Sequence, residues 1–265
     1  MSLSIYVTYW DTDPYQQIQD MIQKGAIQNT RIILAFASFN FISCHYIPGF
    51  QYITMTRVRE IITLVHSVGA KISLSIGGAM HPFLNSDLYA HPEELATTIN
   101  SVVTSFNFDG VDFDIEDFTT SVEFQQNVKT LITMIRFLNP SLYITLTTPT
   151  HNIYHELVKQ SLPTINAWQP MMYGSGCLNT EYVQHVLNYF MASMCVPPNK
   201  IMIGLMCGQD DADNVLTLGE ALDITTYAQN ELVKGIVLWD ANIDGSGSTG
   251  NEPYAYCKGI QTMLV

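Results

Sequence analysis

Eight short stretches rich in β-branched and aromatic residues recur along the chain, and each is followed by a segment long enough for a helix or by the chain's end. These stretches cover residues 4–10, 31–39, 71–76, 110–116, 142–148, 167–173, 201–207 and 235–239. Strands that alternate with helices pair in parallel through right-handed crossovers, and eight such units close most readily into a barrel. The alternation therefore predicts an α/β fold, a TIM (β/α)8 barrel.

Helical patterning is clear in several of the intervening segments. Residues 56–68, 122–138 and 225–233 carry apolar side chains at helical spacing. Pro92, followed by two glutamates, is typical of a helix start, and Gly69 stands where a helix C-cap is expected.

No linker, internal repeat or low-complexity segment divides the 265 residues, so we expect one domain over residues 1–265. The alternative is a doubly wound open sheet. That fold requires a glycine-rich turn after its first strand, whereas residues 9–13 have the sequence Tyr-Trp-Asp-Thr-Asp. The barrel also predicts that the chemistry lies at the carboxyl ends of the strands.

A row of acids lies on the predicted strand 110–116. Because successive side chains of a strand point to opposite faces, Asp112, Asp114 and Glu116 share one face, and the apolar residues between them take the other. Burial of the apolar face predicts that the acids are buried as well. Buried carboxylates about 6.6 Å apart along a strand can share a proton and separate their pKa values. The row therefore indicates general acid–base chemistry, with Glu116 at the strand's end as the terminal acid.

Two other interpretations of the row remain open. The acids could form the solvated face of an edge strand, or they could hold Mg²⁺ or two metal ions for phosphoryl chemistry. The metal hypothesis lacks the basic residues that phosphate needs, since the chain has only 11 Lys and Arg. The net charge of −13 disfavours nucleic acid and anionic membranes as partners and is compatible with a neutral polysaccharide. We expect neither a metal nor a cofactor.

Together with Asp109 and Gly110, the row resembles the Asp-x-x-Asp-x-Asp-x-Glu signature of glycoside hydrolase family 18, which contains chitinases and endo-β-N-acetylglucosaminidases. The resemblance implies retaining, substrate-assisted hydrolysis. Glu116 would protonate the glycosidic oxygen, while the substrate's 2-acetamido oxygen attacks the anomeric carbon and forms an oxazolinium intermediate. Asp114 would orient the acetamido group and Asp112 would hold Asp114, whereas Asp109 would be structural.

Two further parts of the sequence resemble motifs of this family. Ser75, Gly77 and Gly78 match its Ser-x-Gly-Gly signature, which implies that Ser75 supports the acids and that the glycines turn the backbone beneath them or contact substrate. Trp239, at the end of the last predicted strand, resembles the tryptophan that floors the sugar site of small plant-type chitinases. Tyr9 is expected to extend this platform, as are the neighbouring aromatic residues Trp10, Phe39, Phe41 and Phe118.

The stretch 167–174 resembles the family's Met-x-Tyr-Asp/Asn motif. Tyr173 falls on the tyrosine that would hydrogen-bond the acetamido carbonyl, and Gln169 and Met171 are expected to bind substrate. Gly174 departs from the pattern, since the family usually has Asp or Asn there.

Within the family, the resemblance favours a monomeric chitinase that cleaves β-1,4-linked N-acetylglucosamine polymers. The alternatives are an endo-β-N-acetylglucosaminidase acting on N-glycans and a non-catalytic, lectin-like chitin-binding barrel, which Gly174 keeps open. The chain leaves no room for the α+β insertion of larger chitinases, which predicts a shallow groove and internal cleavage.

The N-terminal residues lead straight into a predicted strand, and no signal peptide or membrane-length apolar run is visible. We expect a secreted or exported protein whose signal is not visible in this chain, with a cytoplasmic location as the alternative. The five cysteines lack metal-site spacing, so we expect reduced thiols, with one disulfide as the alternative.

Three weaker patterns are discounted. Residues 240–245 begin like a calcium loop, but the chelating Glu comes one position late. His151 and His155 have the spacing of two helical metal ligands, but no third ligand is in view. A solvated acidic loop is expected at Asp210, Asp211 and Asp213.

Overall fold

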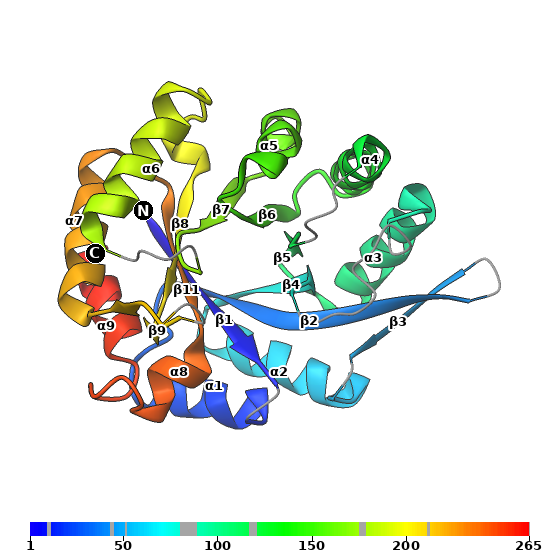
Figure 1. The fold of residues 1–265 in the computed structure, drawn as a ribbon. Helices are drawn as coiled ribbons and strands as arrows, with labels where there is room; N and C mark the ends of the chain where they lie inside the picture. Colours follow the sequence, from blue (N-terminus) through cyan, green and yellow to red (C-terminus); the bar gives the residue numbers. More distant parts are fainter. Residues whose placement is uncertain are drawn as a thin grey trace.

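Eight parallel strands close into a barrel in the computed structural model of this chain (Figure 1). The barrel strands are β1 (Ser2–Thr8), β2 (Thr30–Ile42), β4 (Lys71–Gly77), β5 (Gly110–Asp114), β6 (Tyr143–Pro149), β7 (Ala167–Met171), β8 (Met202–Met206) and β11 (Gly235–Trp239). Each pairs with the next, and β11 pairs with β1, which closes the ring. The predicted (β/α)8 barrel is confirmed.

The structure describes residues 1–9, 12–42, 45–50, 52–79, 89–116, 121–174, 179–210 and 213–264. Helices surround the barrel (Figure 1). They are α1 (Pro14–Gln23), α2 (Met55–Ser67), α3 (Pro92–Phe106), α4 (Val122–Leu138), α5 (His155–Ser161), α6 (Thr180–Ala192), α7 (Leu218–Asn230), α8 (Ala241–Ser246) and α9 (Ala255–Met263), with the short 3₁₀ helices η1 (Asn152–Tyr154) and η2 (Pro198–Lys200).

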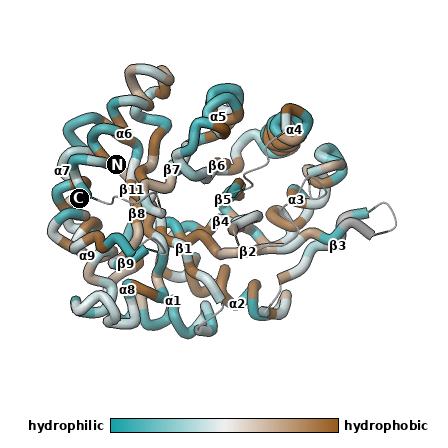
Figure 2. The backbone as a smooth tube through the Cα atoms, viewed as in Figure 1, coloured by the Kyte–Doolittle hydropathy of each residue, from teal (hydrophilic) through white to brown (hydrophobic). Residues whose placement is uncertain are grey.

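The main apolar core lies between the strands and the helices. Alternate strand residues such as Leu74, Val111 and Ile144 point outward and are fully buried against the inner faces of the helices. Figure 2 shows the same division, with apolar colour concentrated on the strands and polar colour on much of the outer helix surface. The outward strand residues therefore hold the barrel together, and the inward ones remain available for chemistry.

Local signals explain where two of the helices start. The Ser121 side chain accepts a hydrogen bond from the Phe124 N–H, so α4 begins directly after it and covers the predicted segment 122–138. The predicted helix 225–233 is wrong in its bounds, because Thr217 and Glu220 form a capping box that starts α7 at Leu218.

The strands predicted at 110–116, 167–173 and 201–207 are shorter than expected, and those predicted at 31–39 and 71–76 are longer. Strand β5 ends at Asp114 and β7 at Met171, so Glu116 and Tyr173 each lie two residues beyond a strand. Strand β2 runs on to Ile42 and pairs with the antiparallel β3 (His45–Phe50), which forms a hairpin that projects from the barrel (Figure 1). A second small sheet joins β9 (Gly208–Gln209) to β10 (Val215–Leu216).

No helix in the described part of the chain is both long and apolar enough to cross a membrane. Three of the cysteines are free thiols, with Cys195 exposed and Cys207 and Cys257 buried. Cys44 and Cys177 lie outside the described residues.

The end of β4 lies very close to β5, which only glycine permits. Gly77 has φ of 120°, and a Cβ there would lie 1.9 Å from the Asp114 carbonyl oxygen. At Gly78, with φ of 89°, a Cβ would lie 2.5 Å from the Phe36 ring. These glycines bring Asp114 and Phe36 to the same end of the barrel.

We therefore expect Gly77→Ala to lower the free energy of unfolding by about 3 kcal/mol, measured by denaturant titration. Gly69→Ala is the matched control, since Gly69 also has a positive φ of 74° but a Cβ there would meet no atom within 4 Å. It should cost only the backbone strain of about 1–2 kcal/mol. Equal costs for the two variants would contradict the packing role of Gly77.

Candidate active site

Asp112 lies in the barrel interior with no exposed surface. Its Oδ2 accepts hydrogen bonds from the hydroxyls of Tyr6 at 2.8 Å and Ser75 at 2.7 Å, and its Oδ1 accepts from Thr145 at 2.6 Å and Thr147 at 2.8 Å. The donors come from β1, β4 and β6. Because β1 and β5 are not neighbours, the bond from Tyr6 to Asp112 crosses the barrel interior.

Two of these hydroxyls have more than one acceptor within reach. The Tyr6 hydroxyl lies 3.0 Å from Thr147 Oγ1, and Thr147 Oγ1 lies 2.9 Å from Oε1 of Gln169. Each hydroxyl has a single proton. When the charge on Asp112 changes, the protons can turn toward or away from it without movement of heavy atoms.

Gln169 belongs to this interior network. Its side chain has no exposed surface, and its amide nitrogen lies 3.9 Å from Met202 Sδ. We expected Gln169 to bind substrate, but its side chain is fully buried and contacts residues of the barrel interior.

Asp114 is the next inward acid along β5 and is 2% exposed. Its Oδ1 is buried and has no hydrogen-bond partner among the described residues. Burial, followed by the charges of Glu116 and Asp112, raises the pKa of Asp114 well above its ordinary value. Burial also raises the pKa of Asp112, but the hydroxyl donors oppose the shift, so of these two carboxyl groups Asp114 is the one that holds a proton.

Glu116 and Tyr173 complete the acidic end of the barrel. Both are partly buried. Burial raises the pKa of the Tyr173 hydroxyl well above its ordinary value, and the charges of Asp114, Glu116, Asp240 and Asp112 act in the same direction. Tyr173 therefore stays protonated at neutral pH and can donate a hydrogen bond next to the acids.

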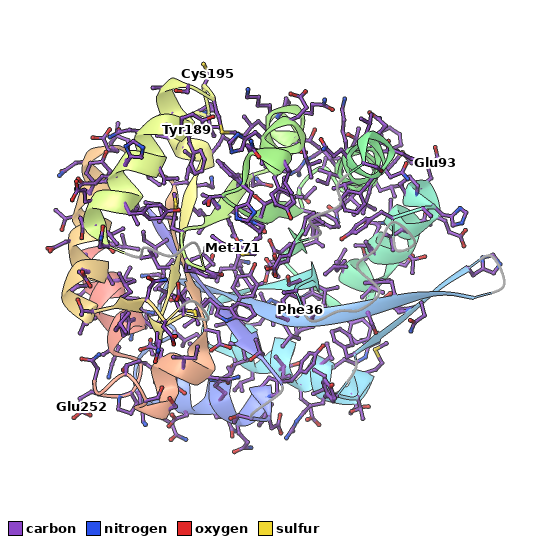
Figure 3. All side chains as sticks on the ribbon, in the orientation of Figure 1. Phe36, Glu93, Met171, Tyr189, Cys195 and Glu252 are labelled. Atoms are coloured by element: carbon purple, nitrogen blue, oxygen red, sulfur yellow. The ribbon has the colours of Figure 1, made fainter. Side chains whose placement is uncertain are left out.

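An aromatic wall stands beside the acids. The Trp239 ring stacks on Phe36 with centroids 6.1 Å apart and an interplanar angle of 25°, and it lies 5.1 Å from the ring of Tyr6. Figure 3 places Phe36 and Met171 toward the middle of the barrel. Met171 is 7% exposed, so it can offer only a small surface to a ligand.

The residue after Trp239 fixes the orientation of this wall. Asp240 accepts a hydrogen bond from Thr8 at 2.9 Å and caps α8 through the Ile243 N–H at 3.0 Å. The calcium-like pattern at 240–245 forms helix α8, and the buried Asp244 carboxylate accepts two backbone N–H groups. These carboxylates serve the fold around Trp239.

Asp210 corrects one prediction and adds an unexpected contact. It is 5% exposed, so it does not belong to a solvated acidic loop. Its Oδ2 accepts the Gly174 N–H at 2.8 Å, and its Oδ1 accepts the Asn214 N–H at 2.9 Å. A carboxylate from the segment after β8 thus lies next to position 174, where the sequence motif lacks its usual polar side chain. Asp211 lies outside the described residues.

Tyr9 links the aromatic wall to a cavity at the rim of the same face. Its hydroxyl donates to the Phe36 carbonyl, and its ring lies 5.4 Å from the ring of Tyr52, which is 60% exposed. Both tyrosines line a cavity of about 570 Å³ with Asp13 and Arg57. Phe39 is 6% exposed and packs in the core, whereas Trp10, Phe118 and the side chain of Phe41 lie outside the described part of the chain.

Asp109 lies at the opposite, amino-terminal end of β5. It accepts hydrogen bonds from His66 and Lys71, both at 2.8 Å, and from the Ile72 N–H at 2.9 Å. Partial burial opposes ionisation, but the bonds from Lys71, Ile72 and His66 outweigh it and lower the pKa of Asp109. The position fits a structural role.

The described residues contain no group of three or more His, Cys, Asp or Glu side chains that could hold a metal ion. Asp112 uses its oxygens on hydroxyls, and Asp210, Asp240 and Asp244 use theirs on backbone N–H groups and side chains of the fold. The described side chains of the site are carboxyl groups, a phenol and an aromatic wall.

A closed barrel with coupled, buried acids and an aromatic wall at the carboxyl ends of its strands has the features of a sugar-cleaving barrel. The sequence model of the family described as glycosyl hydrolases family 18 matches residues 3–258, and the chain belongs to this family of glycosidases.

Solved structures share the fold at low sequence identity. Active domain 2 of a thermostable chitinase from Pyrococcus furiosus, in complex with chito-oligosaccharides, has a TM-score of 0.81 at 15% identity, covering 99% of this chain and 94% of its own. A family 18 chitinase from Pseudoalteromonas aurantia has a TM-score of 0.77 at 19% identity, covering 99% of both chains. Catalytic domain 2 of the group II chitinase of Ostrinia furnacalis has a TM-score of 0.78 at 13% identity, covering 100% of this chain and 96% of its own. No curated protein matches the chain.

The two aspartates at opposite ends of β5 should respond to pH with opposite signs. The fold favours neutral Asp114, so its contribution to stability is present at low pH and is lost as the pH rises through the raised pKa. We expect Asp114→Asn to unfold at a higher temperature than the wild type at pH 8, with the difference closing toward acidic pH. Thermal denaturation followed by circular dichroism measures this.

Asp109→Asn is the matched control. The fold favours ionised Asp109, so its contribution is present above the unfolded pKa of about 4 and is lost as the pH falls. The variant should lose about 1–3 kcal/mol at pH 8 and approach the wild type at the lowest pH. Shifts of the same sign in both variants would contradict the assigned protonation states.

Proposed function

We propose that the protein hydrolyses chitin or chito-oligosaccharides, polymers of β-1,4-linked N-acetylglucosamine, with retention of configuration at the anomeric carbon. The observation that carries the proposal is the buried Oδ1 of Asp114, near Glu116 and Tyr173, which has no hydrogen-bond partner in the described part of the chain. An orphaned buried acceptor is costly, and an amide N–H of a bound ligand would satisfy it. The 2-acetamido group of N-acetylglucosamine carries such an N–H.

The first step would break the glycosidic bond. Glu116 donates its proton to the bridging oxygen, and the C1–O bond breaks as the acetamido carbonyl oxygen attacks C1. The products are a free sugar with a new hydroxyl and a cyclic oxazolinium on the remaining sugar. Asp114 accepts a hydrogen bond from the acetamido N–H, and the Tyr173 hydroxyl donates one to the acetamido oxygen.

The second step would return the enzyme to its starting state. The Glu116 carboxylate takes a proton from water as the water oxygen attacks C1, which reopens the oxazolinium ring and restores the acetamido group. The positive charge of the oxazolinium, which the first step forms and the second discharges, would be stabilised while the proton of Asp114 lies toward Asp112, with the hydroxyls of Tyr6 and Thr147 reoriented to match. Trp239 would support the sugar ring from below.

The family assignment and the fold support the same substrate class. Two of the structural relatives are chitinases in complex with N-acetylglucosamine oligomers. Asp210 lies beside Gly174, and its carboxylate accepts the backbone N–H groups of Gly174 and Asn214, so it supports the backbone where the motif lacks its usual side chain.

Glu116→Gln should lower kcat on a fluorogenic N-acetylglucosamine trimer by about 10³-fold or more, because an amide is too weak an acid to protonate the bridging oxygen, while binding of the oligomer is retained. Hydrolysis assays and calorimetry measure the two effects. Glu123→Gln, an exposed glutamate in the first turn of α4, is the control and should keep full activity. EDTA should leave the activity of the wild type and of Glu123→Gln unchanged.

The outcomes separate the rival functions. If the intact protein binds oligomers without cleaving them, it is a lectin-like barrel. Cleavage of an N-glycan core but not of chitin oligomers would assign an endo-β-N-acetylglucosaminidase. Loss of activity with EDTA would contradict the substrate-assisted mechanism.

Tyr52 and the cavity beside it predict a preference for longer substrates. An exposed ring that packs on Tyr9, next to the wall of Phe36 and Trp239, can stack on a sugar distant from the cleavage point. Tyr52→Ala should lower kcat/KM on a hexamer about tenfold and leave kcat/KM on a trimer unchanged. Tyr52→Phe should keep the wild-type kcat/KM on both substrates. Tyr189→Ala, which removes an exposed ring at the periphery (Figure 3), is the control. Equal effects on both lengths would contradict the distal contact.

A further inference from the structure

A cavity of about 500 Å³ lies at the end of the barrel opposite to the acids. Arg31, Lys71, Tyr143 and Lys234 line it, and each lies at the amino-terminal end of a barrel strand or directly before one. None of the described residues that line the cavity is acidic. Three cations therefore face one space in a protein whose net charge is −13.

Arg31 is the centre of this cationic cavity. It is partly buried, and its guanidinium carbon lies 4.1 Å from the centroid of the Tyr143 ring. One nitrogen donates to Ser73 Oγ at 3.1 Å, and among the described residues no carboxylate lies within ion-pair distance of the guanidinium. A guanidinium has five N–H donors and is costly to bury, and burial lowers the pKa of Arg31 although the charges of Tyr143 and Asp109 oppose the shift.

The neighbouring lysines leave the positive charge only partly compensated. Lys234 Nζ lies 5.8 Å from the same Tyr143 ring and has no carboxylate partner in the described part of the chain. Lys71 pairs with Asp109 at 2.8 Å, which cancels one charge of the three. Lys200, whose charge interacts with that of Lys234, directs its own Nζ to a backbone carbonyl.

The wider surroundings add to the field. Arg136 donates to three backbone carbonyls and to the side-chain oxygen of Asn166 at the base of β6 and β7, and none of these partners among the described residues carries a negative charge. Five of the 11 Lys and Arg of the chain thus gather at one end of the barrel. Like charges held this close repel one another, and an anion in the cavity would relieve the repulsion.

We propose that this cavity binds a compact oxyanion of the phosphate class. The free edge of the Arg31 guanidinium can bind two oxygens at once, while Lys234 and Lys71 supply point charges from the rim. The cavity is larger than a phosphate group and leaves room for an organic part of the ligand. The site is independent of the proposed hydrolysis, since it lies at the opposite end of the barrel.

Calorimetric titration of the full chain with pyrophosphate, at constant ionic strength, tests the proposal. The wild type should bind with one site, and Lys234→Gln should bind at least tenfold more weakly. Lys129→Gln, the same charge change on α4 outside the cavity, should bind like the wild type. Arg31→Lys keeps the charge without the planar fork and should fall between the wild type and Lys234→Gln.

A phosphate ester distinguishes the two sources of the anion. Glucose 6-phosphate that binds more tightly than inorganic phosphate would assign a phosphorylated metabolite, and the reverse order would assign the free anion. Absence of pyrophosphate binding, or equal weakening in Lys129→Gln and Lys234→Gln, would overturn the proposal. Hydrolysis of chitin oligomers by Lys234→Gln should match the wild type, so failure of this site leaves the proposed function intact.

Discussion

The rest of the structure depends on one buried carboxylate and the hydroxyls around it. Asp112 has no contact with solvent, and hydroxyls from three other strands take up its oxygens. A buried charge without donors would destabilise the fold by several kcal/mol, so these strands must meet in register for the barrel to hold the acid. Asp114, the next inward residue along β5, holds a proton and has an oxygen without a hydrogen-bond partner among the described residues.

The barrel separates stability from chemistry by the direction in which side chains point. Outward residues of the strands build the apolar core with the helices, and inward residues build the polar interior. The glycines at the end of β4 let the backbone of β5 come close, and the residues after Trp239 cap a helix that fixes the aromatic wall. Positive charge gathers at the amino-terminal end, where it pairs with Asp109 and surrounds the cavity at Arg31.

Periodicity in the sequence was sufficient to predict the barrel fold and the row of acids on β5, because both follow from local patterns. The alternation of Asp112, Asp114 and Glu116 with apolar residues predicted their shared inward face. The donors Tyr6, Thr145 and Thr147 were missed because they come from strands that are distant in sequence, and only the register of the closed sheet brings them to Asp112. A run of inward-facing hydroxyl residues on the first and fifth barrel strands was the available signal.

The errors have local physical causes. The capping box at Thr217 starts α7 earlier than the apolar spacing suggested, because a cap stabilises a turn that contains Gly219. Asp210 was expected in water, but backbone N–H groups from two segments hold it in the interior. Gln169 was expected to contact substrate, but it is paired with Thr147 of the neighbouring strand. Paired residues point to the same face of a sheet, so Gln169 points into the barrel with Thr147.

The central claim is that coupled acids in the barrel cleave a sugar polymer through the substrate's own acetamido group. Proton NMR of the first product formed from chitotetraose tests it most directly, because the spectrum distinguishes the two anomers before they interconvert. The account predicts that the β anomer appears first. Initial release of the α anomer would contradict it.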